Sequence, residues 1–287
     1  MKPAEPRVWL ITGCSSGFGR SIAEDLLDRG EKVVATARNI EKVRDLTDRG
    51  DTLLLPLDVV SREQCVDAVT AAESHYGRID VLVNNAGVGY FGAIEETSDQ
   101  AARQLFDINF FGTANAINAA LPGMRSRRSG TIVNLTSIGG ISGFAAVGYY
   151  CASKFAVEGL SDALRIEAEP LGVRVMTVEP SAFRTAWAAS STEAPVSIAE
   201  YEPTVGEAIR AYHDSVGRQA GDPARAAAAI FEAVTCPNPP RHLFLGNEAV
   251  DVALNTLDVL RRDVTNWESV SRGADFPQEV GDAASLG

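Results

Sequence analysis

The stretch Thr12-Gly13-Cys14-Ser15-Ser16-Gly17-Phe18-Gly19 follows an apolar run at 7–11 and precedes a helical pattern that ends near Gly30. Glycines in such a turn let the backbone bend tightly and approach a pyrophosphate, and the helix N-terminus supplies free N–H groups and a partial positive charge. The segment therefore predicts a strand, a dinucleotide-binding loop and a helix. An ordinary glycine-rich βα turn is the alternative on this segment alone.

The same alternation of apolar runs and helical patterns continues along the chain. Further strands are predicted at 32–36, 52–56, 80–83, 131–136, 173–178 and 242–245, and helices at 40–48, 61–76, 98–124 and 149–169. Ser61 and Gln64 form a capping box that begins the 61–76 helix. Repeated βα units imply parallel strands joined by right-handed crossovers, so the pattern predicts one α/β domain over 1–287 with a doubly wound sheet.

The interval 181–240 contains no clear strand, but it has helical patterns at about 203–216 and 223–234. An insertion after the sixth strand lies at the carboxyl edge of the sheet, where ligands bind in open α/β folds. We therefore expect a substrate-binding insertion at 181–240. The acidic, aperiodic stretch at about 270–287 is expected to be a loose tail.

Composition excludes several classes of protein. The chain has 287 residues, 45% hydrophobic and 22% charged, which is ordinary globular usage. A net charge of -12 disfavours bare nucleic acid and anionic membranes as partners. The N-terminus has no long apolar run and no stretch approaches ~18 consecutive apolar residues, so neither a signal peptide nor a membrane span is expected. Four cysteines and three histidines share no ligand spacing, which predicts reduced thiols, a cytoplasmic location and no metal.

The end of the second predicted strand reads Thr36-Ala37-Arg38-Asn39 and lacks the acidic residue that would hold an adenosine ribose 2′-hydroxyl. A carboxylate there would repel a 2′-phosphate, whereas Arg38 can pair with one. The sequence therefore favours NADP(H) over NAD(H). The alternative is that Arg38 is only a solvated residue, which leaves NAD(H) open.

Tyr150 and Lys154 are four residues apart in a predicted helix and share one face, whereas Tyr149 has Ser153 at the same distance. A nearby ammonium favours the tyrosinate. Half-ionising a tyrosine at pH 7 takes about three pKa units, or about 4 kcal/mol. An exposed ion pair supplies only ~0.2–1 kcal/mol, so the pair would act on a proton only if partly desolvated.

Other polar residues come at points where the pattern puts them near this pair. Ser137 closes the fifth strand, and its hydroxyl can hydrogen-bond a substrate oxygen without adding charge. Asn84-Asn85-Ala86-Gly87 ends the fourth strand. Asn109 lies within a predicted helix, where asparagine is mildly unfavourable, and a polar surface position is the alternative reading.

In order and spacing these motifs resemble the short-chain dehydrogenase/reductase family over about residues 6–190. The resemblance rests on Thr12-Gly13-x-x-x-Gly17-x-Gly19, Asp58, Asn84-Asn85-Ala86-Gly87, Asn109, Ser137 and Tyr150-x-x-x-Lys154. It implies a Rossmann-type fold with a seven-stranded parallel sheet. It also implies an NAD(P)-dependent oxidoreductase that transfers hydride between the cofactor and a carbonyl or secondary alcohol.

The resemblance also implies roles for these residues. Tyr150 is expected as general acid in reduction and general base in oxidation, with Lys154 lowering its pKa and holding ribose hydroxyls. Ser137 is expected to polarise the carbonyl, and Asn109 to anchor a water in a proton relay. The implied cofactor-binding residues are Gly13, Ser15, Ser16, Gly17, Phe18, Gly19, Arg38, Asp58 at the adenine, Asn85, Ala86 and Gly87 at the adenosine ribose side, Tyr150, Lys154, Pro180, and Thr185 at the carboxamide.

One departure from the family pattern lies in Pro180-Ser181-Ala182-Phe183-Arg184-Thr185, where Ser181 stands in place of the usual glycine. A Cβ restricts the backbone beside the nicotinamide or alters the floor of the substrate pocket. The resemblance therefore leaves the geometry of this loop open, though not the reaction.

A closer resemblance, carried by 12–17 and by Tyr150-Cys151-Ala152-Ser153-Lys154-Phe155-Ala156-Val157-Glu158-Gly159-Leu160, is to hydroxysteroid and retinol dehydrogenases and their bacterial relatives. It implies a hydrophobic substrate, which Tyr90, Phe91, Phe144, Phe183 and Trp187 would suit, although core or loop packing is the more common role for any single one of them. It also implies a homodimer or homotetramer through the Asn109 and Tyr150 helices, with the segment after Gly246 placed to block a second interface. A non-catalytic dinucleotide-binding regulator and a nucleotide-sugar epimerase or dehydratase are the rival functions.

Overall fold

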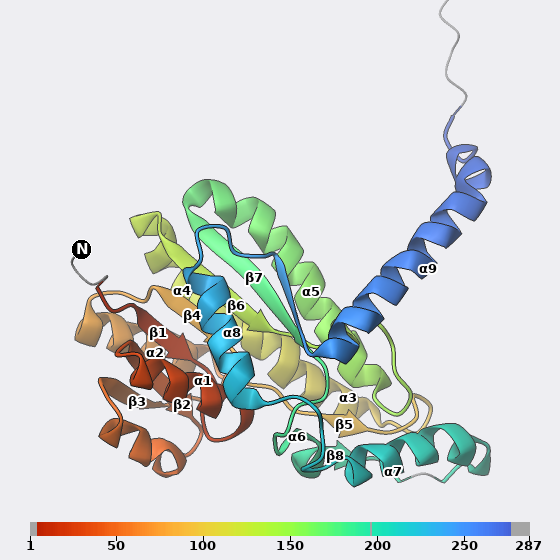
Figure 1. Ribbon diagram of the computed structural model, residues 1–287, viewed down its shortest axis with the longest axis horizontal. Coiled ribbons are helices and arrows are strands. Elements are labelled where there is room, and N and C mark those ends of the chain that lie inside the picture. Colours follow the sequence, from red (N-terminus) through yellow and green to blue (C-terminus); the bar gives the residue numbers. More distant parts are fainter. Residues whose placement is uncertain (1–4, 196, 277–287) are drawn as a thin grey trace, which may run out of the picture.

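A computed structural model describes residues 5–195 and 197–276. Its centre is a parallel sheet of seven strands in the order β3-β2-β1-β4-β6-β7-β9, so the predicted doubly wound, Rossmann-type sheet is confirmed (Figure 1). The strand order reverses between β1 and β4, and this is where doubly wound sheets bind ligands. The strands are β1 (Val8–Ile11), β2 (Lys32–Ala37), β3 (Thr52–Pro56), β4 (Val81–Asn84), β6 (Gly130–Leu135), β7 (Val173–Pro180) and β9 (His242–Leu245).

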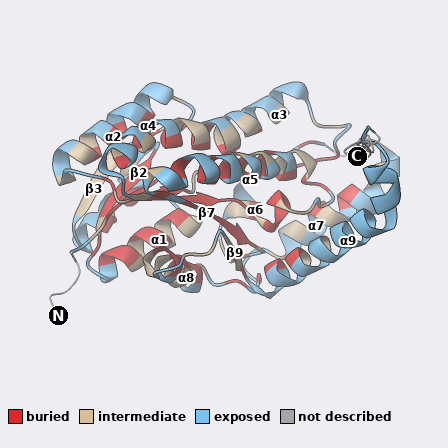
Figure 2. Cartoon of the chain, turned by 90° about the horizontal axis from the view of Figure 1, so that it is seen from above, coloured by how far each residue is buried: buried red, intermediate tan, exposed pale blue. Residues whose placement is uncertain are grey.

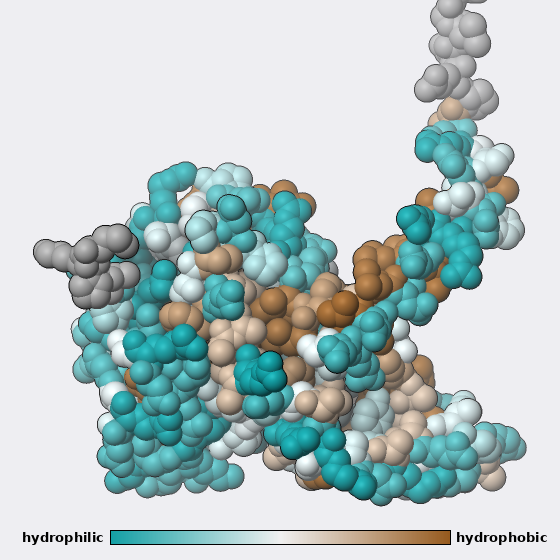
Figure 3. Space-filling model, in the orientation of Figure 1, coloured by the Kyte–Doolittle hydropathy of each residue, from teal (hydrophilic) through white to brown (hydrophobic). Residues whose placement is uncertain are grey.

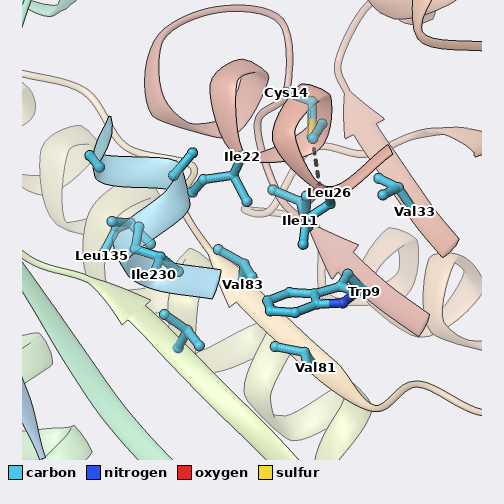
Figure 4. Packing of buried hydrophobic residues seen from close by; sticks show 14 of the residues in the cluster. Trp9, Ile11, Cys14, Ile22, Leu26, Val33, Val81, Val83, Leu135 and Ile230 are labelled. Carbon is cyan, nitrogen blue, oxygen red and sulfur yellow. Dashed lines mark hydrogen bonds between the residues drawn. The ribbon is translucent and has the colours of Figure 1, made fainter. Parts of the chain in front are cut away.

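Helices cover both faces of the sheet because the central strands are apolar on both sides (Figure 2). On one face α1 (Gly17–Asp28) and α8 (Pro223–Thr235) pack together, and Ile22 and Ile230 meet Trp9 and Val83 of the sheet in the core shown in Figure 4. The short helix η1 (Ile40–Asp48) joins this side. The other face carries α2 (Arg62–Tyr76), α4 (Gly112–Arg127) and α5 (Gly148–Ala168) over a second core.

The helix starts follow the sequence signals. Ser61 accepts from the Gln64 N–H at 3.2 Å and begins α2, while Ser98 accepts from the Ala101 N–H at 3.2 Å and begins α3 (Asp99–Phe106). The predicted helix at 98–124 is not uniform: a π-helical turn, η2 (Asp107–Phe111), separates α3 from α4. The short helices η3 (Ile138–Gly140) and η4 (Glu169–Leu171) flank α5.

The predicted insertion after β7 divides into two parts. Its first part comprises α6 (Trp187–Ser190), β8 (Thr192–Glu193), η5 (Ala199–Tyr201), η6 (Glu202–Gly206) and α7 (Glu207–Asp214). β8 pairs with β5 (Tyr90–Phe91), and these elements form a small apolar cluster at the carboxyl edge of the sheet. The second part is α8, which packs against α1 and so belongs to the helical layer.

The chain then forms α9 (Asn247–Arg272), a helix of 26 residues that projects from the body (Figure 1). The loose tail expected from about residue 270 is therefore wrong for residues 270–272, whose helical pattern continues from 247. Residues 277–287 of that prediction lie outside the described residues. Within the described part of the chain, no helix has both the length and the apolar character needed to cross a bilayer.

Candidate active site

The glycine-rich loop between β1 and α1 has a backbone that only glycine adopts easily. Gly13 and Gly17 have φ angles of +74° and +59°. At Gly19 the limit is space, because a Cβ would lie 2.3 Å from Asn85 Nδ2 and 2.4 Å from the Gly13 carbonyl oxygen. The three glycines predicted to bind a cofactor are therefore required by the turn itself.

Asn85, just after β4, fixes this loop from the neighbouring strand. Its Nδ2 donates to the carbonyl oxygens of Thr12 and Gly13 at 2.8 and 3.0 Å. Thr12 Oγ1 accepts from the N–H groups of Asn85 and Ala86, both at 3.0 Å. The Asn85 side chain is thus engaged within the protein, which leaves its backbone and that of Ala86 and Gly87 to line the site.

The N-terminus of α1 has the properties of a phosphate site. Ser16 is the N-cap residue and makes no side-chain cap hydrogen bond, and no acidic residue lies in the first turn of this fully described helix. The first N–H groups of a helix lack intrahelical acceptors and favour an anion. Together with the tight glycine turn, this donor set fits the diphosphate of a dinucleotide.

Arg38 and Asp58 follow the adjacent strands β2 and β3. The Leu57 N–H donates to the Ala37 carbonyl at 3.1 Å, which aligns the residues that come next, Arg38 and Asp58, at the same edge. Arg38 is exposed and makes no ion pair with any described residue. Asp58 Oδ1 accepts from the Val60 N–H at 3.1 Å, so one carboxylate oxygen holds its own turn. Because Arg38 is exposed and has no ion-pair partner among the described residues, its guanidinium is available to a ligand.

Tyr150 and Ser137 meet beside η3. Ser137 is the N-cap of η3, and its Oγ accepts from the Gly139 N–H at 3.0 Å. A Cβ at Gly139 would lie 3.4 Å from both Ser137 Oγ and Tyr150 Cε1, so the glycine keeps space between these groups. Burial raises the pKa of Tyr150 above its ordinary value, and the hydrogen bond with Ser137 opposes that rise.

Lys154 lies one turn beyond Tyr150 and is buried. Its Nζ lies 5.8 Å from the centroid of the Tyr150 ring and donates to the Leu135 carbonyl at 2.8 Å. Burial lowers the pKa of Lys154 to about 8, and the charge of Glu158 opposes that change. In the free protein burial is the largest effect on the Tyr150 pKa, which is raised, and the expected lowering by Lys154 stays a prediction for the loaded site.

Asn109 sits in the π-helical turn η2 and is buried. Its Oδ1 accepts from the Val88 N–H at 2.9 Å, and its Nδ2 donates to the Val88 carbonyl and to Ser153 Oγ, both at 3.0 Å. A Cβ at Gly87 would lie 3.3 Å from Asn109 Oδ1 and 3.6 Å from Lys154 Nζ. Gly87, Asn109 and Lys154 therefore converge on one small volume.

Ser153 is a structural link that the sequence pattern did not single out. Its Oγ donates to the Tyr150 carbonyl at 2.7 Å and accepts from Asn109, so it ties the turn that carries Tyr150 to η2. Its position three residues after Tyr150 puts it near the same helical face, which is the only signal in the sequence.

Aromatic side chains cover Tyr150, with Trp187 and Tyr212 coming from the first part of the insertion and Phe91 from β5. The Trp187 ring lies 5.0 Å from the Tyr150 ring and 5.6 Å from that of Phe91, and the Phe91 and Tyr212 rings are 5.0 Å apart. Phe144 packs against the same cluster. Tyr212, on α7, was not predicted, because its helical pattern does not indicate which face meets the site.

The segment after β7 closes over the glycine-rich loop. Phe183 and Phe18 have ring centroids 5.0 Å apart, and a Cβ at Gly17 would lie 3.5 Å from the Thr185 Cβ. Pro180 ends β7 and is buried. Thr185 and Phe18 thus lie on the same side of the sheet edge as the loop, as their proposed roles require.

Gly246 leaves the space that the side chain of Ser181 occupies. The Ser181 N–H and Oγ both donate to the Leu245 carbonyl, at 3.0 and 3.3 Å. Gly246 has a φ of +95°, and a Cβ there would lie 2.4 Å from Ser181 Oγ. Ser181 is not among the described residues with positive φ. The hydroxyl therefore lies against the end of β9 without backbone strain.

A second polar cluster lies beyond Lys154. Glu158, Glu179 and His242 each place a ligand atom within 4.8 Å of the others, although their spacing in sequence predicts no metal site. His242 Nδ1 is 2.9 Å from Glu179 Oε1 and 3.7 Å from Glu158 Oε2. Burial and the charge of Glu179 raise the pKa of Glu158 to about 7. The cluster places a buried acid, Glu158, one helical turn after Lys154 on α5.

Comparison with known proteins places the chain in a family. The family model of the short chain dehydrogenases matches residues 7–195. A 3-ketodihydrosphingosine reductase from Bacteroides thetaiotaomicron is 37% identical over 242 residues, 82% of this chain and 86% of the relative. Retinol dehydrogenase 8 from Homo sapiens is 36% identical over 257 residues, 83% of this chain and 80% of the relative.

Solved structures share the fold. A short-chain dehydrogenase from Streptomyces avermitilis is 42% identical, with a TM-score of 0.87 over 95% of this chain and 100% of that one. A Burkholderia cenocepacia short chain dehydrogenase in complex with NADP is 26% identical, with a TM-score of 0.71 over 91% and 97% of the two chains. A Brucella melitensis 3-ketoacyl-(acyl-carrier-protein) reductase complexed with NADH is 25% identical, with a TM-score of 0.71 over 83% and 96%. The chain therefore belongs to the short-chain dehydrogenase/reductase family and is an NAD(P)-dependent oxidoreductase that acts on CH–OH groups.

Proposed function

We propose that the protein uses NADP(H) to interconvert a ketone and a secondary alcohol on a largely hydrophobic substrate. The observation that carries this proposal is the surroundings of Tyr150, whose hydroxyl is hydrogen-bonded with Ser137 and whose ring lies 5.0 Å from that of Trp187. Trp187 in turn contacts Phe91 and Tyr212, and these three rings form the aromatic cover. Such a site offers two hydroxyl groups to one oxygen atom and apolar surface to everything around it.

The relatives support the substrate class. The 3-ketodihydrosphingosine reductase and the retinol dehydrogenase are both named for substrates with long apolar parts. The aromatic cover of this chain comes from residues 187–212 together with Phe91, so an apolar substrate would be enclosed by the first part of the insertion. A polar nucleotide-sugar would leave its hydroxyl groups facing aromatic rings, which costs free energy.

The exposed guanidinium of Arg38 supports NADP(H) over NAD(H). It lies at the end of β2 without a described ion-pair partner, and no carboxylate follows the strand directly. Asp58 is close by, but its Oδ1 is engaged with the Val60 N–H. A 2′-phosphate at this edge would gain a charge-assisted hydrogen bond with Arg38.

The mechanism follows from the positions of the hydroxyl groups. A bound nicotinamide dinucleotide supplies the hydride in reduction and accepts it in oxidation. Ser137 donates a hydrogen bond to the carbonyl oxygen, and Tyr150 transfers its proton to that oxygen as negative charge develops. The raised pKa of Tyr150 keeps this proton in place in the free protein, which is the protonation state that reduction requires.

Lys154 and Asn109 act from behind the tyrosine. The Lys154 ammonium, at 5.8 Å from the ring centroid, offsets the charge of the phenolate that remains after proton transfer. Asn109 and Ser153 hold the backbone of Val88 and Tyr150 in register, so that the proton is delivered from a fixed position. In oxidation the same proton returns to Tyr150.

The proposed assembly is a homodimer, and the proposed location is the cytoplasm. Phe111, Phe155 and Ile166 are exposed apolar residues on η2 and α5, and burying them between two copies would give the dimer that the family resemblance implies. The four cysteines are free and three of them are buried, which suits a reducing cytoplasm.

The test is consumption of reduced cofactor by the full chain across a series of ketones of increasing apolar size. We expect kcat/KM to rise with the size of the apolar part and to be larger with NADPH than with NADH. A preference for short polar ketones would contradict the substrate class, and a preference for NADH would contradict the role of Arg38. Stoichiometric cofactor binding without turnover of any ketone or alcohol would favour a regulator instead.

A further inference from the structure

The largest group of exposed apolar side chains in the described chain lies on α9. Ala249 and Ala253 near the start of the helix are buried against the body, but every residue from 257 to 272 is exposed. Figure 3 shows apolar side chains continuing from the body along this projecting helix. The exposed side chains include Leu257 at 62%, Leu260 at 60%, Val264 at 62% and Trp267 at 62% of their full accessible area.

These side chains repeat with a period that one helix uses to pack against another. Positions 250, 253, 257, 260, 264 and 267 alternate in steps of three and four, which is the a and d pattern of a heptad repeat. The last four of these positions lie on the projecting part of the helix, and the α9 seam is defined here as Leu257, Leu260, Val264 and Trp267. We propose that the α9 seam pairs with the α9 seam of a second copy of this chain.

An unpartnered helix of this kind is unfavourable in water. Isolated helices of about 12–15 residues are marginal even with good helix formers, and most helix stability in proteins comes from packing an apolar face. Pairing the seams of two copies removes on the order of 1,000 Å² from water, which is the lower limit for a specific interface. A helix of matching period is the shape that such a seam accepts.

The charges of α9 favour a second copy over other occupants. The whole chain carries a net charge of -12, yet the projecting part is neutral and would not repel itself. In a parallel pair Asp263 at position g would face Glu268 at position e, whereas an antiparallel pair sets position e against position e and places Arg261 beside Glu268. Arg261 and Glu268 would then exchange their present partners within the helix, Asp258 and Arg272, for each other. The charged residues at 257–272 are Asp258, Asp263, Glu268, Arg261, Arg262 and Arg272.

A lipid surface fits this face less well. Membrane-surface helices carry an excess of Lys and Arg on the polar face, which draws them to anionic headgroups. Here three arginines are matched by three acids, and two pairs are already formed within the helix, Arg261 with Asp258 at 3.0 Å and Arg272 with Glu268 at 2.8 Å. Neither the charge balance nor the strongly acidic body attracts an anionic bilayer.

The experiment is light scattering coupled to size exclusion, with the full chain and two variants. The double variant Leu260→Glu and Val264→Glu places charges on the seam, and both residues are exposed, so the fold should not depend on them. We expect the wild type to be a dimer or tetramer and the double variant to have half its mass. Val259→Glu is the matched control, because Val259 is also an exposed apolar residue of α9 but lies off the seam. It should keep the wild-type mass.

Three results would overturn the pairing. They are a monomeric wild type at micromolar concentration, a double variant with the wild-type mass, and a control that dissociates like the double variant. A monomeric wild type that floats with phosphatidylcholine vesicles, while the double variant does not, would assign the face to lipid. The expected halving of mass does not depend on the proposed contact through η2 and α5, because that contact is unchanged in both variants.

Discussion

At Tyr150, burial and hydrogen bonding act on the pKa in opposite directions, and burial is the larger effect. The i, i+4 spacing with Lys154 indicates that the two residues share a helical face. It does not indicate that Lys154 Nζ donates to the Leu135 carbonyl. The free protein therefore holds a protonated tyrosine. Ionisation of Tyr150 would need further positive charge nearby, which a bound oxidised cofactor would supply.

Arg38 carries the prediction on cofactor choice. Arg38→Asp removes the guanidinium and adds a charge that repels a 2′-phosphate, so NADPH affinity should fall by about 10- to 100-fold, the equivalent of one lost charge-assisted hydrogen bond. NADH affinity should change much less. Fluorescence titration of both cofactors measures this. Arg44→Asp is a control, because Arg44 is an exposed arginine of η1 paired with Glu41. Equal losses for NADPH and NADH in Arg38→Asp would refute the assignment.

Ser181 and Gly246 form a pair whose energetic coupling is measurable. Gly246→Ala places a Cβ 2.4 Å from Ser181 Oγ at a φ of +95°, so it should destabilise the protein by about 1–3 kcal/mol. Ser181→Gly alone should cost little, and in the double variant it should recover the steric part of the loss but not the backbone part. Denaturant unfolding measures all three free energies. Strict additivity would show that the two side chains do not compete for this space.

Among the elements, the π-helical turn η2 is the feature that positions the site most directly. It interrupts the predicted helix at 98–124 and turns Asn109 inward, where it binds both backbone groups of Val88 and the Ser153 hydroxyl. A mid-helix asparagine signals an unusual position in the sequence. The extra residue in the turn does not appear in hydrophobic periodicity, because α3 and α4 each keep their own helical pattern.

Asn109→Ala should separate positioning from stability. The variant loses three hydrogen bonds, and Asn115→Ala is a matched control on α4 that loses the Asn115 contacts to the carbonyls of Val59 and Val60 at 3.0 and 3.3 Å. Both should lower the melting temperature by a few degrees. Only Asn109→Ala should also lower kcat, by about 10-fold or more, with little change in cofactor affinity. Equal kcat values in the two variants would assign Asn109 a purely structural role.

The strands and most helices could be predicted because their signals are local. Apolar runs, the Ser61 and Ser98 caps and the glycine-rich turn each depend on neighbouring residues. The packing of the C-terminal helix and of the aromatic cover could not be predicted in this way. The heptad pattern of α9 indicates a helix but not the surface that its apolar side meets. Trp187 meets Tyr150, and Tyr212 meets Trp187, only after the chain returns to the sheet edge.

At the scale of the whole molecule, the cluster of Glu158, Glu179 and His242 makes the free energy of unfolding depend on pH. Glu158 on α5 faces Glu179 on β7 and His242 on β9, with Lys154 and Arg165 as the nearby cations. The pKa of Glu158 is raised to about 7, so the folded protein holds this proton more tightly than the unfolded chain. The His242 pKa is also raised, mainly by its hydrogen bond with Glu179.

Both shifts make stability fall as pH rises. The unfolded chain releases the Glu158 proton near pH 4.5, whereas the folded protein releases it near 7, so the contribution is present below about 4.5 and is lost through that window. His242 acts in the same direction above pH 6.5. Glu158→Gln should therefore be more stable than the wild type at pH 8 and flatten the profile between pH 5 and 8. Glu167→Gln, an exposed change on the same helix, should follow the wild type. A Glu158→Gln profile as steep as the wild type would show that this carboxyl is not the source.

The most direct measurement of the central claim compares Tyr150→Phe with Tyr149→Phe in the full chain. Each variant loses one hydroxyl from adjacent residues of α5, and each is assayed for cofactor affinity and for turnover of the best ketone. Tyr150→Phe should keep its affinity for the cofactor and lose turnover by several orders of magnitude, while Tyr149→Phe should stay near wild type in both. Near-wild-type turnover in Tyr150→Phe would show that another group delivers the proton.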